Sequence, residues 1–202
     1  MYYNQKDDRP DGLVIALKKS KLEGIGDAKV VHYNDIKAKH PMDYLYEGYI
    51  GQILLCRVKG TDNYFLIGNT HLLAMVGRDA RVGAISMLIQ QLGELREMYK
   101  DKKLATIICG DLNETPREGT ICRLRNFPVN TDHEYNYIKE NIKGFLVDYP
   151  CVLPLKSAYA GYIKDDKDKL NEGHPEYTNY TVDYVATLDY IFYDYKYSYY
   201  IH

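Results

Sequence analysis

The chain has 202 residues, of which 46% are apolar and 27% are charged, with a formal net charge of −2. This apolar content suffices for one domain with its own core, and the near balance of charge excludes a histone-like binder of nucleic acid. Any nucleic-acid surface must therefore be local, with a metal to offset phosphate charge. The 22 tyrosines admit two interpretations, a compositional bias or stacking platforms for bases.

Apolar runs rich in β-branched residues predict strands early in the chain, and a longer periodic run predicts a helix. Strands are expected over 13–17, 29–33, 50–58 and 64–70, with Gly60 in a hairpin turn between the last two. A helix is expected over 79–99, because apolar side chains recur there at helical spacing, at Ile85, Leu88, Leu92 and Leu95.

The next segment combines a buried strand, expected over 104–109, with a helix start. Thr115 has the character of an N-cap, Pro116 fits the first helical position, and Glu118 completes a capping box. These residues predict a short helix that runs to about Asn126.

The last third has less regular patterning. Residues 128–154 show no clean period, so helix and loop both remain open there, whereas 164–176 is charged and predicts a surface loop. Residues 187–195 have the composition of a strand. Since no linker or repeat divides the chain, we expect one domain over 1–202, of the α+β or layered α/β class.

The four cysteines lie far apart and lack the spacing of a zinc site. Cys56 and Cys109 fall in predicted strands, where cysteine is usually a small core residue. A reducing compartment fits this usage best. We find no signal peptide, transmembrane run or lipidation motif, so the expectation is a soluble intracellular protein.

Polar side chains lie in or directly after three of the predicted strands, and their chemistry is that of phosphoryl transfer. His71 ends the strand in NTHL, Asp111 and Asn113 follow the next strand in GDLN, and Asp189 lies in the late strand LDYIFY. A carboxylate can orient an attacking water, an amide can donate to a phosphate oxygen, and an imidazole can stabilise developing charge.

Each of these residues also has a structural interpretation. His71 could lie in a surface loop, and Asp111 could cap a turn. Asp189 is expected to be buried in an apolar strand, where a carboxylate costs several kcal/mol unless it is compensated. A structural hydrogen bond would supply that compensation without any catalytic role.

The ordered set NTHL, ICGDLNETP and LDYIFY resembles the endonuclease/exonuclease/phosphatase superfamily. Within it, the pattern is similar to the messenger-RNA deadenylases of the carbon-catabolite-repressor type and to their angel and nocturnin relatives. The stretches LKSAY and YTNYTVDYVATLDYIFY, and the start DGLVIALKKSKLE, extend the resemblance over roughly residues 10–194.

The resemblance implies an α+β fold, a four-layer α/β/β/α sandwich of two packed mixed sheets with outer helices. It implies that Asp111 orients water and binds Mg²⁺ or Mn²⁺, that Asn113 contacts the scissile phosphate, and that His71 stabilises the transition state. Asp189 would hold a catalytic histidine in its correct tautomer. The implied activity is 3′–5′ exoribonuclease action on the poly(A) tails of messenger RNA.

The same resemblance places Tyr184 against an adenine base and Asn179 in the same substrate-facing segment. Tyr184 could equally be one more surface tyrosine. The implied partners are RNA 3′ ends and proteins of a deadenylase complex, the implied location is the cytoplasm or the nucleus, and no membrane is involved.

The chain departs from the family pattern in three places. It contains neither the Q-E pair, whose glutamate is the principal metal ligand, nor the S-D-H motif, and Ile85 stands where the family usually has glutamine. The sandwich is therefore expected to be incomplete at its first and last strands. We predict little or no nuclease activity from these 202 residues alone. Metal-dependent shortening of an oligoadenylate by this purified chain would contradict that prediction.

Two rival functions remain. One is another phosphodiesterase or phosphatase of the same superfamily, which assays on A-tailed and other RNA would separate. The other is a catalytically inactive module that binds RNA or a partner protein. Such a module would keep its RNA affinity without metal and after Asp111→Ala.

Overall fold

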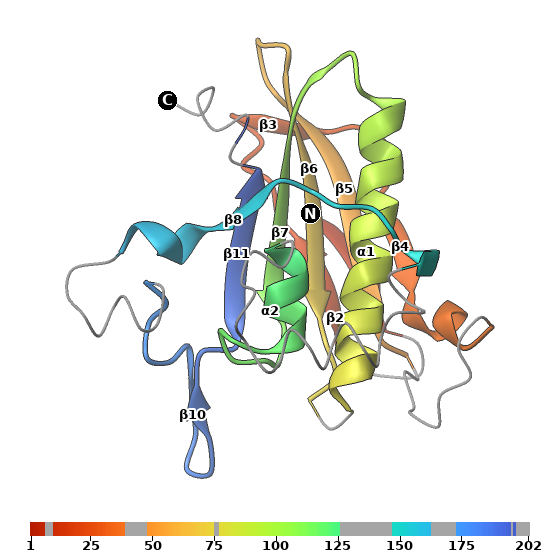
Figure 1. Cartoon of the computed structure of the whole chain (residues 1–202). Helices are drawn as coiled ribbons and strands as arrows, with labels where there is room; N and C mark the ends of the chain where they lie inside the picture. Colours follow the sequence, from red (N-terminus) through yellow and green to blue (C-terminus); the bar gives the residue numbers. More distant parts are fainter. Residues whose placement is uncertain are drawn as a thin grey trace.

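The computed structural model describes residues 1–6, 10–38, 48–74, 77–125, 147–162, 173–194 and 196, and its main feature is a large mixed β-sheet (Figure 1). The strands of this sheet are β3 Leu22–Gly24, β4 Lys29–His32, β5 Ile50–Val58, β6 Asn63–His71, β7 Lys103–Asp111, β8 Leu155–Ser157 and β11 Asp189–Asp194. Among the described residues their order is β3–β5–β6–β7–β11–β8, and β4 also pairs with β5. The pair β6–β7 is parallel, and the other pairs are antiparallel.

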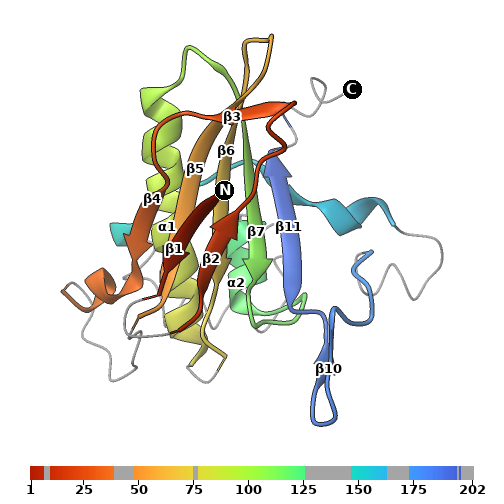
Figure 2. The same ribbon diagram turned by 180° about the vertical axis from the view of Figure 1, so that it is seen from behind.

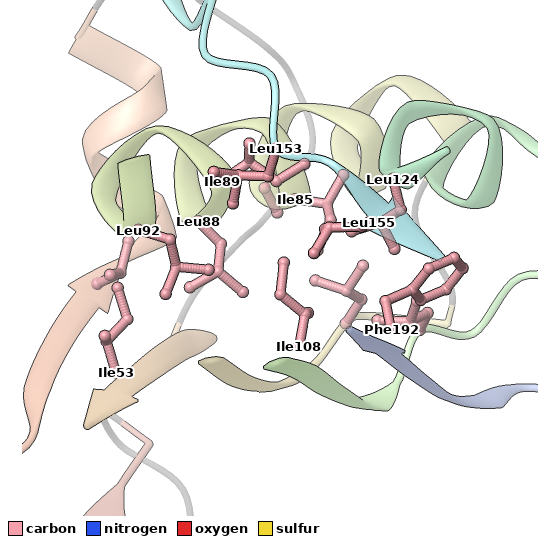
Figure 3. Packing of buried hydrophobic residues seen from close by; sticks show 14 of the residues in the cluster. Ile53, Ile85, Leu88, Ile89, Leu92, Ile108, Leu124, Leu153, Leu155 and Phe192 are labelled. Carbon is pink, nitrogen blue, oxygen red and sulfur yellow. The ribbon is translucent and has the colours of Figure 1, made fainter. Parts of the chain in front are cut away.

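Two helices, α1 (Arg78–Met98) and α2 (Gly119–Leu124), cover one face of this sheet (Figure 1). The crossover between the parallel strands β6 and β7 requires such an element, and α1 provides it. Its apolar side chains meet those of the sheet in one core, shown in Figure 3, which includes Ile85, Leu88, Leu92, Ile53, Ile108 and Phe192. Burial of one such side chain contributes about 1.5–3 kcal/mol, and several of them hold α1 on the sheet.

A two-stranded antiparallel sheet lies on the opposite face (Figure 2). It consists of β1 (Tyr2–Gln5) and β2 (Gly12–Ile15). The side chain of Gln52 in β5 donates to the carbonyl of Tyr2 at 3.1 Å and to Oδ1 of Asn4 at 2.6 Å. Asn69 in β6 donates to the carbonyl of Val14 at 3.2 Å. Side-chain hydrogen bonds therefore join the two sheets.

The remaining elements are short. Two 3₁₀ helices, η1 (Tyr33–Ala38) and η2 (Ala158–Gly161), follow β4 and β8. The strands β9 (Asn179–Tyr180) and β10 (Val185–Ala186) form a hairpin that projects beside the start of β11 in both views (Figures 1 and 2). Within the described ranges, no helix is long and apolar enough to cross a membrane.

The expected α+β sandwich is confirmed, with helices, a mixed sheet and a second sheet in successive layers. The part of the chain that the structure describes contains no helices outside the second sheet. The strands predicted up to 104–109 correspond to β2, β4, β5, β6 and β7, the late strand to β11, and the long helix to α1. Most of 128–154 and of 164–176 lies outside the described residues.

The predicted start of the second helix is wrong by about one turn. Thr115 is not its cap, because α2 begins only at Gly119. Instead, the buried carboxylate of Glu114 accepts a hydrogen bond from the N–H of Thr120 in the first turn of α2, at 2.6 Å. Glu118 does reach back to the N–H of Thr115, as a capping box requires, but it closes a turn that precedes the helix.

Cys56, a buried residue of β5, predicts a pH dependence of stability. Burial raises the pKa of its thiol from 9.0 to about 11. The folded state holds this proton more tightly than the unfolded state does. The protonated thiol therefore makes its full contribution to the free energy of unfolding below pH 9, and this contribution is lost as the pH rises towards 11. Between about pH 8 and pH 10.5, urea unfolding should show the wild-type chain losing about 2 kcal/mol more than Cys56→Ala. An equal loss in both proteins would contradict this assignment.

Candidate active site

Three of the predicted site residues lie side by side where three neighbouring inner strands of the large sheet end or begin. His71 ends β6 and is in register with Asp111 at the end of the parallel strand β7. Asp111 is in turn in register with Asp189, the first residue of the antiparallel strand β11. Residues in register on neighbouring strands lie about 5 Å apart and project to the same face. His71 Nε2 is 3.8 Å from Asp111 Oδ2. We call these three residues the carboxylate–histidine row.

Asp111 is the central member of the row and is half-buried. Its Oδ1 accepts a hydrogen bond from the N–H of Asn113 at 2.9 Å. Burial raises the pKa of Asp111 above 3.8, and Asp189 adds to the rise, while the Asn113 N–H, His71 and Lys6 oppose it. The carboxylate therefore lies in a partly desolvated place, where the Asn113 N–H and Lys6 favour its charged form and Asp189 disfavours it.

Asn113 connects the two loops that follow β6 and β7. Its φ is +49°, a left-handed conformation that asparagine tolerates better than most residues. Its Nδ2 donates to the carbonyl of Leu72 at 2.7 Å, and the N–H of Leu72 donates to the carbonyl of Asp111 at 2.9 Å. One of the two amide N–H groups of Asn113 is thus used in positioning. The other is the donor that contact with a phosphate would require.

Gly110 allows β6 and β7 to approach closely just before Asp111. Its φ is +140°, and a Cβ at this position would lie 1.8 Å from the carbonyl oxygen of Thr70. Only glycine fits such a place. The glycine of the GDLN motif is therefore needed for the backbone that delivers Asp111 beside His71.

Asp189 differs from the expectation in its environment. It was expected to be buried, but it is exposed at the start of β11. Thr178 compensates it, since the hydroxyl of Thr178 donates to Asp189 Oδ2 at 2.7 Å. The same hydroxyl accepts the N–H groups of Leu188 and Asp189, at 3.0 and 2.9 Å. The prediction that Asp189 is buried was thus wrong. Asp189 is the first residue of its strand, and the end of a strand can be exposed even when the residues that follow are apolar.

The two residues predicted to bind a base lie on the β9–β10 hairpin. The backbone of Tyr184 accepts from Asn179 Nδ2 and Thr181 Oγ1, and the side chain of Tyr184 is 52% exposed. Asn179 therefore shapes the turn that carries Tyr184. The hairpin begins next to Thr178, so it starts beside Asp189. Ile85, where the family usually has glutamine, is a core residue of α1 (Figure 3).

A buried ion pair, not anticipated from the sequence, joins the two site loops from behind. Arg81 of α1 donates to Glu114 Oε1 at 2.8 Å and to the carbonyl of Ala74 at 3.1 Å. Tyr190 donates to the carbonyl of Glu114 at 2.8 Å. The loop after His71 and the loop after Asp111 thus share one anchor. Arg81 and Glu114 are far apart in the sequence, and no local pattern predicts their contact.

Lys6 was also missed. It is fully buried, and its Nζ is 3.2 Å from His71 Nδ1 and 2.6 Å from Asp11 Oδ2. Only the packing of the β1–β2 sheet on the large sheet brings this lysine to His71.

Known proteins share features of this sequence and of this fold. The sequence profile of the Endonuclease/Exonuclease/phosphatase family matches residues 31–197. The 3′-5′-exoribonuclease subunit Ccr4 of the CCR4-Not complex of Mycosarcoma maydis is 26% identical over 219 residues, which cover 92% of this chain and 30% of that protein.

Solved structures show the same fold. ANGEL2, a 2′,3′-cyclic phosphatase in complex with adenosine-2′,3′-vanadate, superposes with a TM-score of 0.71 at 20% identity, over 95% of this chain and 62% of that one. The human Nocturnin catalytic domain superposes with a TM-score of 0.51 at 20% identity, over 88% and 50%. The chain thus spans under a third of the curated relative and half to three-fifths of these structures. The profile match extends over most of the chain, and by it the chain belongs to the endonuclease/exonuclease/phosphatase family.

Proposed function

We propose that this chain carries the phosphate-handling part of a metal-dependent phosphodiesterase that removes nucleotides from the 3′ end of RNA. Members of the family are hydrolytic enzymes. The observation that carries the proposal is the register of the carboxylate–histidine row across three neighbouring strands, with Asn113 beside it. Such a row offers donors and carboxylates to one phosphate-sized group.

Each residue of the row has a role in the proposed reaction. A water attacks phosphorus and loses a proton, the bond from phosphorus to the 3′ oxygen of the preceding nucleotide breaks, and that oxygen takes up a proton. The products are a nucleoside 5′-monophosphate and an RNA with a new 3′-hydroxyl. Asp111 accepts a hydrogen bond from the attacking water and so orients it. His71 and Asn113 donate to the non-bridging oxygens, where negative charge grows in the transition state. Asp189 is the partner for a histidine that would complete the site, as the resemblance implies.

A divalent metal fits this site only in part. Members of the family generally use divalent metal ions. The residues that the structure describes contain no group of three or more histidine, cysteine or acidic side chains placed to hold one. Mg²⁺ commonly uses one or two carboxylates, with water and substrate phosphate as its other ligands. Asp111 fits as one ligand of Mg²⁺ or Mn²⁺, and the bound metal would neutralise phosphate charge.

The proposed substrate is the poly(A) tail of messenger RNA. Tyr184 supports this choice, because its ring is half exposed on a hairpin that starts beside Asp189. The name of the Ccr4 relative, a 3′-5′-exoribonuclease subunit of the CCR4-Not complex, supports RNA as substrate and the proteins of a complex as partners. That this is a deadenylase complex is what the family resemblance implies. We place such a protein in the cytoplasm or the nucleus.

Replacing Tyr184 by alanine should weaken the binding of oligoadenylate to this chain about 5- to 150-fold, since base–aromatic stacking contributes about 1–3 kcal/mol. Fluorescence anisotropy of a labelled oligoadenylate would measure the change. Tyr3→Ala is the matched control, because Tyr3 is also 52% exposed but lies on β1. Equal affinities for both variants would remove Tyr184 from the site.

The activity itself is tested by a shortening assay on 5′-labelled RNA with the whole protein. We expect oligoadenylate to shorten from its 3′ end in the presence of Mg²⁺, and Asp111→Asn to reduce the rate at least about 100-fold. Oligouridylate should react more slowly. Preferential opening of a terminal 2′,3′-cyclic phosphate would favour the phosphatase alternative. RNA binding that survives both chelation and Asp111→Ala, without any hydrolysis, would favour an inactive binding module.

A further inference from the structure

Lys6 is a fully buried lysine at the candidate site, where the β1–β2 sheet meets the large sheet. It directly follows β1, and its backbone N–H donates to the carbonyl of Asp11 at 3.0 Å, which closes the connection to β2. Buried lysines are rare unless their charge is paired. The partners of this ammonium group therefore indicate why it is there.

The three hydrogens of the Lys6 ammonium have three partners. Nζ lies 2.6 Å from Asp11 Oδ2, 3.2 Å from His71 Nδ1, and 4.4 Å from the centroid of the Tyr49 ring. The first contact is an ion pair, the second a hydrogen bond and the third a cation–π contact. The Tyr49 ring also packs edge-on against the imidazole, with ring centroids 6.1 Å apart.

This arrangement determines which nitrogen of His71 carries hydrogen. An ammonium group only donates, so a hydrogen bond from Lys6 requires Nδ1 to be the acceptor. In a neutral imidazole the hydrogen is then on Nε2. Nε2 is the nitrogen that lies 3.8 Å from Asp111 Oδ2, on the side of the carboxylate–histidine row.

We infer that Lys6 is a positioning residue that holds His71 as the neutral Nε2–H tautomer, with its donor directed to the substrate side. The purpose of this tautomer rests on the proposed function, because it makes His71 a donor to phosphate oxygens. The β1–β2 sheet thereby supports a row of residues that comes from three strands of the large sheet. Asp11, the aspartate of the D-G motif, neutralises Lys6 in turn.

Nitrogen-15 NMR of the imidazole rings tests the inference on this chain without any need for activity. At about pH 8, where histidine is mostly neutral, the native chain should show a protonated Nε2 and an unprotonated Nδ1 for His71. His71→Gln identifies the resonances by their loss. In Lys6→Met the two nitrogen shifts should move towards each other, as the tautomers mix. Lys19→Met removes an exposed lysine near the same end of the chain and should change nothing.

Two results would overturn the inference. One is a native His71 protonated on Nδ1, which needs only the His71→Gln assignment and is unaffected if Lys6→Met fails to fold. The other is a folded Lys6→Met chain whose His71 keeps the Nε2–H signature. The test is separate from the proposed function, because a chain without nuclease activity can still show the tautomer. Conversely, an active enzyme with the opposite tautomer would leave the function standing and remove the role of Lys6.

Discussion

Gly110→Ala is expected to lower the free energy of unfolding by more than about 3 kcal/mol, and the folded fraction should fall accordingly. Two costs add at this position. The backbone has a φ that L-residues rarely adopt, and this strain alone costs about 1–3 kcal/mol. In addition, the new Cβ would lie 1.8 Å from the carbonyl oxygen of Thr70, so β6 and β7 must separate at the site. Urea unfolding followed by circular dichroism measures the sum.

Gly60→Ala separates these two costs. Gly60 has a φ of +78° in the β5–β6 turn, but a Cβ there would meet nothing within 4 Å. This variant should therefore show the backbone cost alone, about 1–2 kcal/mol. If Gly110→Ala lost no more than Gly60→Ala, the close approach of the two strands would not be the reason for the glycine of the GDLN motif.

Glu114→Gln is expected to destabilise the chain by about 3–5 kcal/mol, the usual cost of leaving one partner of a buried ion pair uncompensated. Glu114 is completely buried, Arg81 nearly so, and the carboxylate also accepts the N–H of Thr120. An amide has one acceptor oxygen for these donors and no charge for the guanidinium. Thermal or urea unfolding would measure the loss.

Glu97→Gln is the matched control for this change. Glu97 pairs with Lys100 at the same 2.8 Å, but both side chains are well exposed. An exposed pair contributes little, so this variant should stay within about 0.5 kcal/mol of the wild type. Similar effects of the two substitutions would mean that Glu114 and Arg81 do not form the anchor of the site loops.

The regular part of the fold was predictable because its signals are local. The long helix and the inner strands are runs of apolar residues with a clear period, and burial of those runs is what the large sheet and α1 provide. β1 has the sequence YYNQ and β9 and β10 have two residues each, so none offers a period to detect. Their pairing comes from tertiary contacts.

In the candidate site, too, some contacts were predictable from the sequence and others were not. His71 and Asp111 could be placed near each other, since each ends a strand. The alignment of Asp189 with Asp111 is a pairing between distant segments, and it was expected only from the family resemblance. Nothing local indicated that Thr178 would hold Asp189 or that Lys6 would reach His71. Both contacts arise where separate pieces of the chain pack together.

The hydroxyl of Thr178 links the base of the β9–β10 hairpin to the start of β11. It bonds the Asp189 carboxylate on one side and the backbone at residues 188 and 189 on the other, and the next residue begins the projecting hairpin. Thr178 therefore joins the base of the hairpin to the Asp189 carboxylate by a direct hydrogen bond. If the hairpin binds a base as proposed, that binding would bear directly on the position of the Asp189 carboxylate.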